Sequence, residues 1–418
     1  MGRALKKYGI EFQVTRVGKY KSAVEPFLLD GMSEENRAQQ KKLLDDLWLD
    51  WKTSVAKDRG IRPEDIQQLA DEKAILTAGE AERAGLLDKL AYFDEVLDEL
   101  KSLSGRTEKD QDFPQIDLVD YAKIPPTGGG KSRIAVVYAE GEIVDGDGDG
   151  GQVGGDRLGR ELRELRLDPD VKAIVLRVNS PGGSATASDV VQREVIQARK
   201  VKPLVVSMGT VAASGGYWIS TYGDHIFAEP ETITGSIGVF GLLPNVKKLA
   251  NDHGITWDRV QTAKLGLPSI SRPNTPEEMA RIQAIVDDIY DQFLLKVAES
   301  RRMKKEDVQE IAQGRVWSGR EAVRLGLVDE LGGLQDAVRY AAKLAKVEND
   351  YRMDTPFPTP SALEKAMKFL GRKSGRKVVR IGLGDQLKSA WEQQFQQLNA
   401  LNDPRAVYAR MPFDLTLR

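Results

Sequence analysis

A serine flanked by small residues is the first position in this sequence that could do chemistry. Ser214 lies in the small-residue stretch 212–216, where the strand predicted from the apolar run 204–206 ends and a helix begins. Small neighbours let a substrate backbone approach closely, and the first N–H groups of a following helix have no partner within that helix. Ser214 is therefore a candidate nucleophile, although capping of the helix is the commoner use of a serine at such a point.

Glycines in two turns could supply the hydrogen bonds that such an attack requires. The turn 179–184 contains Gly182 and Gly183 and follows a second apolar run, 173–176. Their backbone N–H groups, together with that of Gly215, are candidate donors to the oxyanion that forms when a hydroxyl attacks a carbonyl carbon.

The residue types available for a catalytic base are few. The sequence has no cysteine and two histidines. His225 fits an ordinary strand and His253 an ordinary turn, so a serine–histidine triad has few candidates. A lysine is therefore the predicted base.

Two lysines compete for that role. Lys21 lies in the segment 16–27, and Lys264 lies in a corresponding part of an internal repeat. A lysine must be neutral to accept a proton, and burial at a domain interface would lower its pKa toward that state. Ser236, in the third glycine-containing segment 234–238, could orient the amine by accepting a hydrogen bond.

The internal repeat relates residues 1–108 to residues 246–348. The matched blocks include 64–70 with 306–312 and 77–88 with 318–329. The stretch that contains Ser214 has no counterpart before Met1, so the first repeat is expected to be only the rear half of a domain, and the chain the remainder of a longer two-repeat protein. Aligned on Gly9 and Gly254, the repeats place Lys21 opposite Gly266; a shift of two residues places it opposite Lys264.

Composition and spacing predict an α/β protein whose parts differ in character. The first expected division is a truncated first repeat that contributes the lysine (1–108), followed by a polar linker that ends in a Pro- and Gly-rich run (109–132). A second repeat that contributes the serine (133–350) and a C-terminal tail (351–418) complete the chain.

The same composition argues against several other functions. A formal net charge of -2 gives no electrostatic footprint for nucleic acid. The chemistry described above needs neither metal nor cofactor, and the Asp–Gly loop 145–151 lacks the glutamate and flanking helices of a calcium loop. No run of about twenty apolar residues is present, so this chain is expected to carry no transmembrane segment.

Four segments taken together resemble the signal peptide peptidase A (protease IV) family in its long two-domain form. These are the segments 18–27, 179–184, 211–218 and 234–238. The resemblance implies a Clp-protease/crotonase-like fold and a serine–lysine dyad peptidase that needs no cofactor. It also implies Ser214 as nucleophile, Lys21 as general base and Ser236 as the hydroxyl that positions the lysine, with oxyanion amides at Gly183 and Gly215.

The resemblance further implies a setting for the protein. Members of the family degrade the apolar remnants of signal peptides at the bacterial cytoplasmic membrane, on its extracytoplasmic side, or at the thylakoid. They assemble into tetramers. Against this family pattern, we expect the N-terminal membrane anchor and the front half of the first domain to be absent from this sequence.

Two other functions are compatible with parts of the pattern. A glycine-rich oxyanion hole also serves thioester enolates, so a crotonase-type acyl-CoA enzyme is one alternative. A non-catalytic, truncated subunit of an assembly is the other. The serine-plus-lysine set favours the peptidase, and the missing part of the first repeat favours the subunit.

Overall fold

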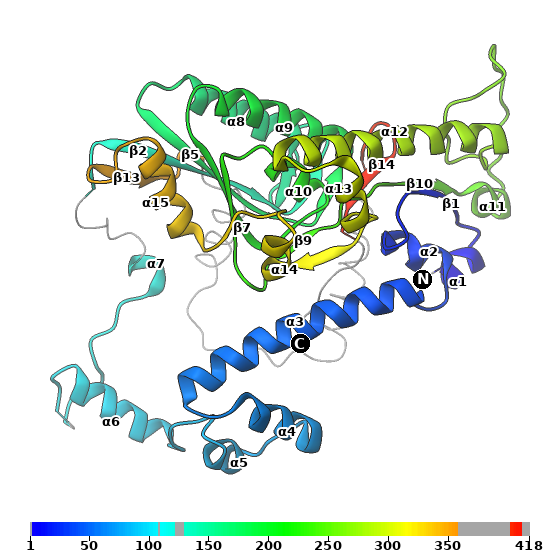
Figure 1. Ribbon diagram of the computed structural model, residues 1–418. Helices are drawn as coiled ribbons and strands as arrows, with labels where there is room; N and C mark the ends of the chain where they lie inside the picture. Colours follow the sequence, from blue (N-terminus) through cyan, green and yellow to red (C-terminus); the bar gives the residue numbers. More distant parts are fainter. Residues whose placement is uncertain (1, 108, 122–128, 358–401, 412–418) are drawn as a thin grey trace. The chain divides into compact units, whose positions relative to one another are not determined.

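The computed structural model describes residues 2–107, 109–121, 129–357 and 402–411 (Figure 1). They fall into two compact units, one formed by residues 1–44 with 130–418 and the other by residues 45–129. The sequence-based division of the chain is not tested by this partition and stays a prediction.

The larger unit contains two sheets and the helices that cover them. Its strands are β1 (Glu11–Arg16), β2 (Ser132–Glu140), β3 (Glu142–Val144), β4 (Gln152–Gly154), β5 (Val171–Ser180), β6 (Gly182–Ser184), β7 (Leu204–Ala213), β8 (His225–Ala228), β9 (Ile233–Gly235), β10 (Phe240–Asn245), β11 (Val316–Ser318), β12 (Glu330–Leu331), β13 (Tyr351–Asp354) and β14 (Val407–Arg410). Its helices are α1 (Gly2–Lys7), η1 (Ser22–Val24), α2 (Glu25–Leu28), α8 (Gly155–Leu167), α9 (Ala185–Arg199), α10 (Gly215–Ser220), α11 (Lys247–Asp252), α12 (Pro276–Arg301), α13 (Lys305–Ile311), α14 (Gly319–Arg324) and α15 (Leu334–Leu344), with the first part of α3 (Glu34–Arg59).

The centre of the larger sheet is made of parallel strands that are buried on both faces. Among the described residues its strand order is β11-β9-β7-β5-β2-β13, with β8 beside β7 and β12 beside β8. Val136 and Val175 pack with α15 on one face, while Val137 and Leu176 pack with α8 and α9 on the other (Figure 1). Two covered faces explain why these strands read as continuous apolar runs, and the α/β class predicted from the sequence is confirmed.

The smaller sheet joins segments that lie far apart in the chain. Its order in the described residues is β1-β10-β14-β6-β3-β4. The first strand of the chain, β1, pairs antiparallel with β10, and β14 lies between β10 and β6. Two strands from the predicted C-terminal tail therefore take part in the sheets, because β13 also pairs with β2. Residues 358–401 and 412–418 of that tail lie outside the described residues.

Matched blocks of the sequence repeat form matched helices. α3 and α12 each have 26 residues. Thr77 and Ser318 are the N-caps of α5 (Ala78–Arg83) and α14, and each side chain accepts from the backbone N–H three residues on. Thr275 and Glu278 form a capping box at the start of α12.

The smaller unit consists of the second part of α3 followed by short helices. These are α4 (Pro63–Lys73), α5, α6 (Phe93–Leu103) and α7 (Leu118–Tyr121). Trp48 of α3 stacks on Trp51 at a centroid distance of 5.1 Å and donates from its indole nitrogen to Gln67 Oε1 of α4 (2.6 Å). None of the described helices is long and apolar enough to cross a membrane.

Candidate active site

Ser214 occupies the turn between β7 and α10 in a backbone conformation that is rare for serine. Its φ is 57° and its ψ is −113°. Non-glycine residues with positive φ are uncommon, and such strain is concentrated at functional sites. Ser214 is the N-cap of α10, but its side chain makes no capping hydrogen bond. The Ser214 hydroxyl therefore does not cap the helix, which was the alternative role considered from the sequence.

The Ser214 hydroxyl lies against the amine of Lys21. Lys21 Nζ lies within hydrogen-bond distance of Ser214 Oγ (2.8 Å), Ser236 Oγ (3.0 Å) and the backbone oxygen of Ser236 (3.1 Å). All three residues are fully buried. The structure thus brings the three predicted residues together within one chain, although 193 positions separate Lys21 from Ser214.

The surroundings of Lys21 disfavour its ammonium form. Removal of the ammonium group from water lowers the pKa of Lys21 well below its usual value, and the positive charge of Arg410 lowers it further. The partners of the amine are hydroxyl and carbonyl oxygens rather than a carboxylate. A neutral amine in this position can accept the proton of the Ser214 hydroxyl, which is the requirement for an activated nucleophile.

Strand pairing holds Ser236 beside Ser214. Ser236 follows β9, which pairs in parallel with β7 and antiparallel with β11. The Ser214 backbone nitrogen donates to Gly235 O (2.8 Å), and the Ser236 backbone nitrogen donates to Arg315 O (2.7 Å). Ser236 also has a positive φ, of 50°. Both serines are therefore fixed by backbone contacts of the sheet rather than by their own conformational preference.

The predicted oxyanion glycines come from two elements that meet beside Ser214. Gly182 and Gly183 are in β6, and Gly215 begins α10. A Cβ at Gly182, whose φ is +95°, would lie 2.6 Å from the Gly215 nitrogen and 2.1 Å from Ala409 O, so this backbone approach requires glycine. The N–H of Gly182 donates to Ser180 Oγ (3.2 Å). That donor is engaged and Gly183 is paired with Ala409 of β14, so Gly215 at the start of α10 is the strongest of the three candidates for an oxyanion contact.

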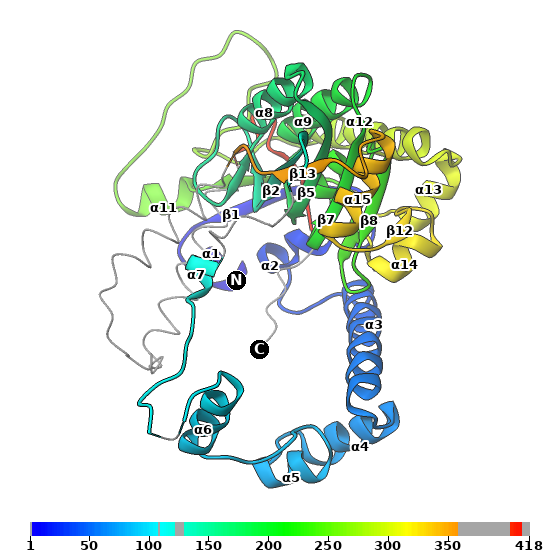
Figure 2. The same ribbon diagram turned by 90° about the vertical axis from the view of Figure 1, so that its left-hand side faces the viewer.

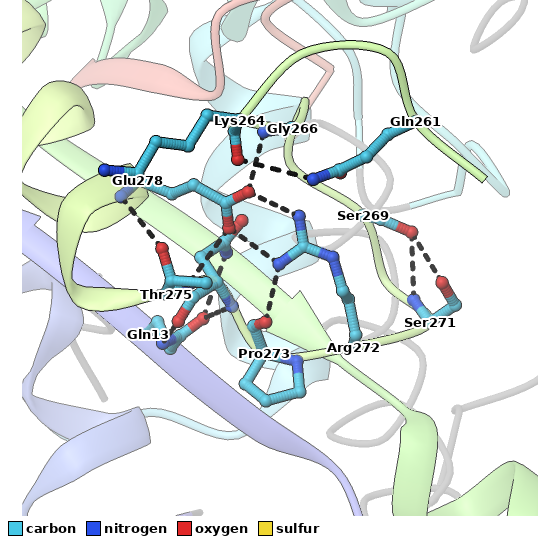
Figure 3. Close-up of polar contacts among 11 residues, drawn as sticks. Gln13, Gln261, Lys264, Gly266, Ser269, Ser271, Arg272, Pro273, Thr275 and Glu278 are labelled. Carbon is cyan, nitrogen blue, oxygen red and sulfur yellow. Dashed lines mark hydrogen bonds and ion pairs between the residues drawn. The ribbon is translucent and has the colours of Figure 1, made fainter. Parts of the chain in front are cut away.

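The rival base, Lys264, lies on an exposed part of the long loop between α11 and α12 (Figure 2). Its backbone oxygen accepts from Gln261 Nε2 (3.3 Å), and Arg272 and Glu278 form an ion pair where the loop joins α12 (Figure 3). Ser214, by contrast, is fully buried. The structure does not bring Lys264 to the buried serine.

The histidines also lie elsewhere. His225 is in β8, where its ring stacks on Tyr340 at a centroid distance of 4.2 Å. His253 is exposed, and its Nδ1 lies 2.8 Å from Leu249 O. In the part of the chain that the structure describes, no group of three or more His, Cys, Asp or Glu side chains is arranged to hold a metal ion.

Sequence reasoning missed two residues near the amine. Arg410 of β14 carries the positive charge that acts on Lys21 and pairs with Glu142 (2.7 Å). Gln39 of α3 donates to the backbone oxygen of Tyr20 (2.9 Å), next to Lys21. Neither belongs to a glycine-rich segment, and Gln39 stands in a polar run that reads as an exposed helix surface. No local signal distinguishes them.

Comparison with known proteins extends these observations to a family. The sequence matches the model of peptidase family S49 over residues 1–106 and 196–348. It is 39% identical to protease 4 of Salmonella typhi, an alignment that covers 97% of this chain and 68% of that protein. It is 34% identical to the chloroplastic serine protease SPPA of Arabidopsis thaliana, covering 83% of this chain and 52% of that protein.

A similarity to a solved structure was also found. A point mutant of ClpP1 from Listeria monocytogenes aligns with 49% of this chain and 94% of its own, at 16% sequence identity and a TM-score of 0.33. The chain spans about half to two thirds of the length of the curated relatives given above.

Proposed function

Because this chain belongs to peptidase family S49, we propose that it is a serine endopeptidase with Ser214 as nucleophile and Lys21 as general base. The observation that carries the proposal is the contact of the buried Lys21 amine with the hydroxyls of Ser214 and Ser236. A serine hydroxyl is a weak nucleophile until an adjacent base takes its proton, and a lysine serves once burial has made it neutral.

The reaction follows from these contacts. The neutral Lys21 amine accepts the Ser214 proton while Ser214 Oγ bonds to the peptide carbonyl carbon. The amides of Gly215 and Gly183, with Gly182 beside them, face the charge that develops on the carbonyl oxygen. The Lys21 ammonium then gives its proton to the leaving amine as the C–N bond breaks, which leaves an acyl group on Ser214.

Deacylation uses the same residues in reverse. Lys21 takes a proton from a water molecule, whose oxygen attacks the acyl carbon, and Ser214 recovers its proton when the ester bond breaks. Ser236 holds the amine between its hydroxyl and its backbone oxygen throughout the cycle. Ser236 therefore fixes the direction of the amine toward Ser214 and is not itself consumed.

The substrate and setting are proposed from the resemblance noted in the sequence. We propose apolar peptides, including remnants of signal peptides, as substrates at the extracytoplasmic face of the cytoplasmic membrane. We also propose a homotetramer as the working assembly.

Covalent labelling tests the proposed nucleophile. A fluorophosphonate probe is expected to modify Ser214, with the modified peptide identified by mass spectrometry, and Ser214→Ala is expected to abolish labelling and cleavage of an apolar peptide ester. Cleavage that persists in Ser214→Ala, or turnover of an acyl-CoA in place of the peptide ester, would exclude the proposed function.

A further inference from the structure

A buried glutamine lies behind the proposed base and has no part in the chemistry described above. Gln39 is on the first turns of α3 and only 2% exposed, although the residues beside it in the sequence, Ala38 and Gln40, are exposed and partly buried. A buried amide is stabilising only when its donors and acceptor are bonded. The hydrogen-bond partners of the Gln39 amide therefore indicate the role of this residue.

The donor end of Gln39 contacts the residues on both sides of Lys21, the backbone of Tyr20 and the side chain of Ser22. Gln39 Nε2 donates to Tyr20 O (2.9 Å) and lies 3.5 Å from Ser22 Oγ, so it contacts the residues before and after the lysine. Two long-range backbone hydrogen bonds also hold residues 17–21: the Val17 nitrogen donates to Val239 O (3.1 Å) and the Tyr20 nitrogen donates to Gln313 O (3.0 Å).

The acceptor end of Gln39 holds the strand pair that presents the serines. Its Oε1 accepts from the Val316 backbone nitrogen (3.4 Å) at the start of β11. Val316 pairs with Gly235 of β9, the residue before Ser236. The oxygen of Gly235 in turn accepts from the Ser214 nitrogen (2.8 Å). One amide thus connects the loop that carries the base to the strands that carry both hydroxyls.

Further polar residues hold the amide in place. Gln39 Nε2 lies 3.3 Å from Asn36 Oδ1, and Asn36 Nδ2 donates to the buried carboxylate of Glu25 (3.0 Å). Ser33 Oγ donates to the other oxygen of that carboxylate (2.5 Å). Glu25 belongs to the same sequence segment, 18–27, as Lys21. The segment therefore supplies the base and also the carboxylate that anchors the start of α3.

We propose that Gln39 is a positioning residue, which fixes the distance between the Lys21 amine and the Ser214 hydroxyl by tying the lysine loop to β11. The inference rests on the proposed function. Lysine has a long flexible side chain, so the position of its amine depends on how firmly its backbone is held. An error of about 1 Å in a reacting group can cost about a hundredfold in rate.

The test compares the same change at two glutamines. Gln39→Met keeps the size of the side chain but removes its hydrogen bonds, and Gln292→Met on α12 is the matched control, since the Gln292 amide bonds to Asp288 of its own helix rather than to the lysine loop. For Gln39→Met we expect kcat for an apolar peptide ester to fall by about 10- to 100-fold with KM changed by less than about threefold. Gln292→Met is expected to retain the wild-type kcat.

A double-mutant cycle separates positioning from general loosening of the fold. Because Gln39 acts through Lys21, Gln39→Met is expected to have no further effect on the rate of fluorophosphonate labelling in a Lys21→Ala background. Gln39→Ala serves as a second variant, and thermal unfolding monitors folding of each protein. A wild-type kcat in folded Gln39→Met or Gln39→Ala, or an equal additional loss in the Lys21→Ala background, would overturn the inference. Failure of the proposed function itself would instead be seen as activity in Ser214→Ala.

Discussion

Gly314 packs directly against Lys21. A Cβ built on Gly314 would lie 2.8 Å from Lys21 Cβ and 2.8 Å from the Lys21 backbone nitrogen, and the φ of Gly314 is +78°. The N–H of Gly314 also donates to Ile237 O (2.8 Å), directly after Ser236. Space for the lysine backbone and the position of the segment after Ser236 thus depend on the same glycine.

This contact predicts a specific effect of Gly314→Ala. Atoms this close must move apart, so the Lys21 loop should shift, and we expect kcat for a peptide ester to fall by at least about tenfold. Gly326→Ala is the control: its φ is +74°, but its Cβ would meet only Met303 Sδ at 4.0 Å. Both variants should lose about 1–2 kcal/mol of stability from the left-handed backbone, measured by denaturant unfolding. Equal activities of the two variants would show that the contact with Lys21 is unimportant.

The choice of base leads to a second prediction. Lys21→Ala should reduce kcat by about a hundredfold or more, the usual contribution of a general base, because no other group among the described residues is in contact with both serine hydroxyls. Lys264→Ala should stay within about twofold of wild type, since Lys264 is exposed on its loop. Steady-state kinetics with both proteins in the same assay decides the matter. Loss of activity in Lys264→Ala with full activity in Lys21→Ala would reverse the assignment.

The protonation of Lys21 predicts how activity varies with pH. The acidic limb of kcat/KM should follow deprotonation of Lys21, whose pKa is lowered by burial and by the charge of Arg410. Arg410→Gln removes that positive charge, and its removal favours the ammonium form of Lys21. The limb should therefore move to higher pH while the alkaline plateau is retained. Arg405→Gln, on the same segment and bonded to Thr186, is the control. An unmoved limb in Arg410→Gln would contradict the prediction.

The same lowered pKa predicts a pH-dependent stability. Between the lowered folded-state value and the ordinary value of 10.5, the unfolded chain binds more protons at Lys21 than the folded protein does. The free energy of unfolding of the wild type minus that of Lys21→Met should therefore increase with pH through this window, by about 1.4 kcal/mol per pH unit in its middle. Below the lowered value the difference should be constant and least favourable to the wild type. Urea unfolding at a series of pH values measures it, and a difference that does not vary with pH would show that Lys21 keeps an ordinary pKa.

Local features of this protein could be predicted from its sequence because they depend on neighbouring residues. The apolar runs at 173–176 and 204–206 lie within β5 and β7, since a strand covered on both faces needs apolar side chains at successive positions. The strand–turn–helix order around Ser214 and the capping box of α12 follow from similarly short patterns. Ser214, Lys21 and Ser236 could be named as candidates from such patterns and from the family resemblance.

The relation among those candidates depends on tertiary structure. β1 pairs with β10, and β9 pairs with both β7 and β11, and these pairings bring residues about two hundred positions apart into hydrogen-bond contact. Only the folded chain excludes water from Lys21 and sets the positive φ of Ser214 and Ser236. Folding also places Gln39 and Arg410 near Lys21. The sequence by itself determined which residues could react, because reactivity requires particular residue types and local spacings, and both can be read without the structure. The tertiary structure decided which of them meet and lowered the pKa of Lys21, because distance and burial arise from packing between segments that are far apart in the sequence.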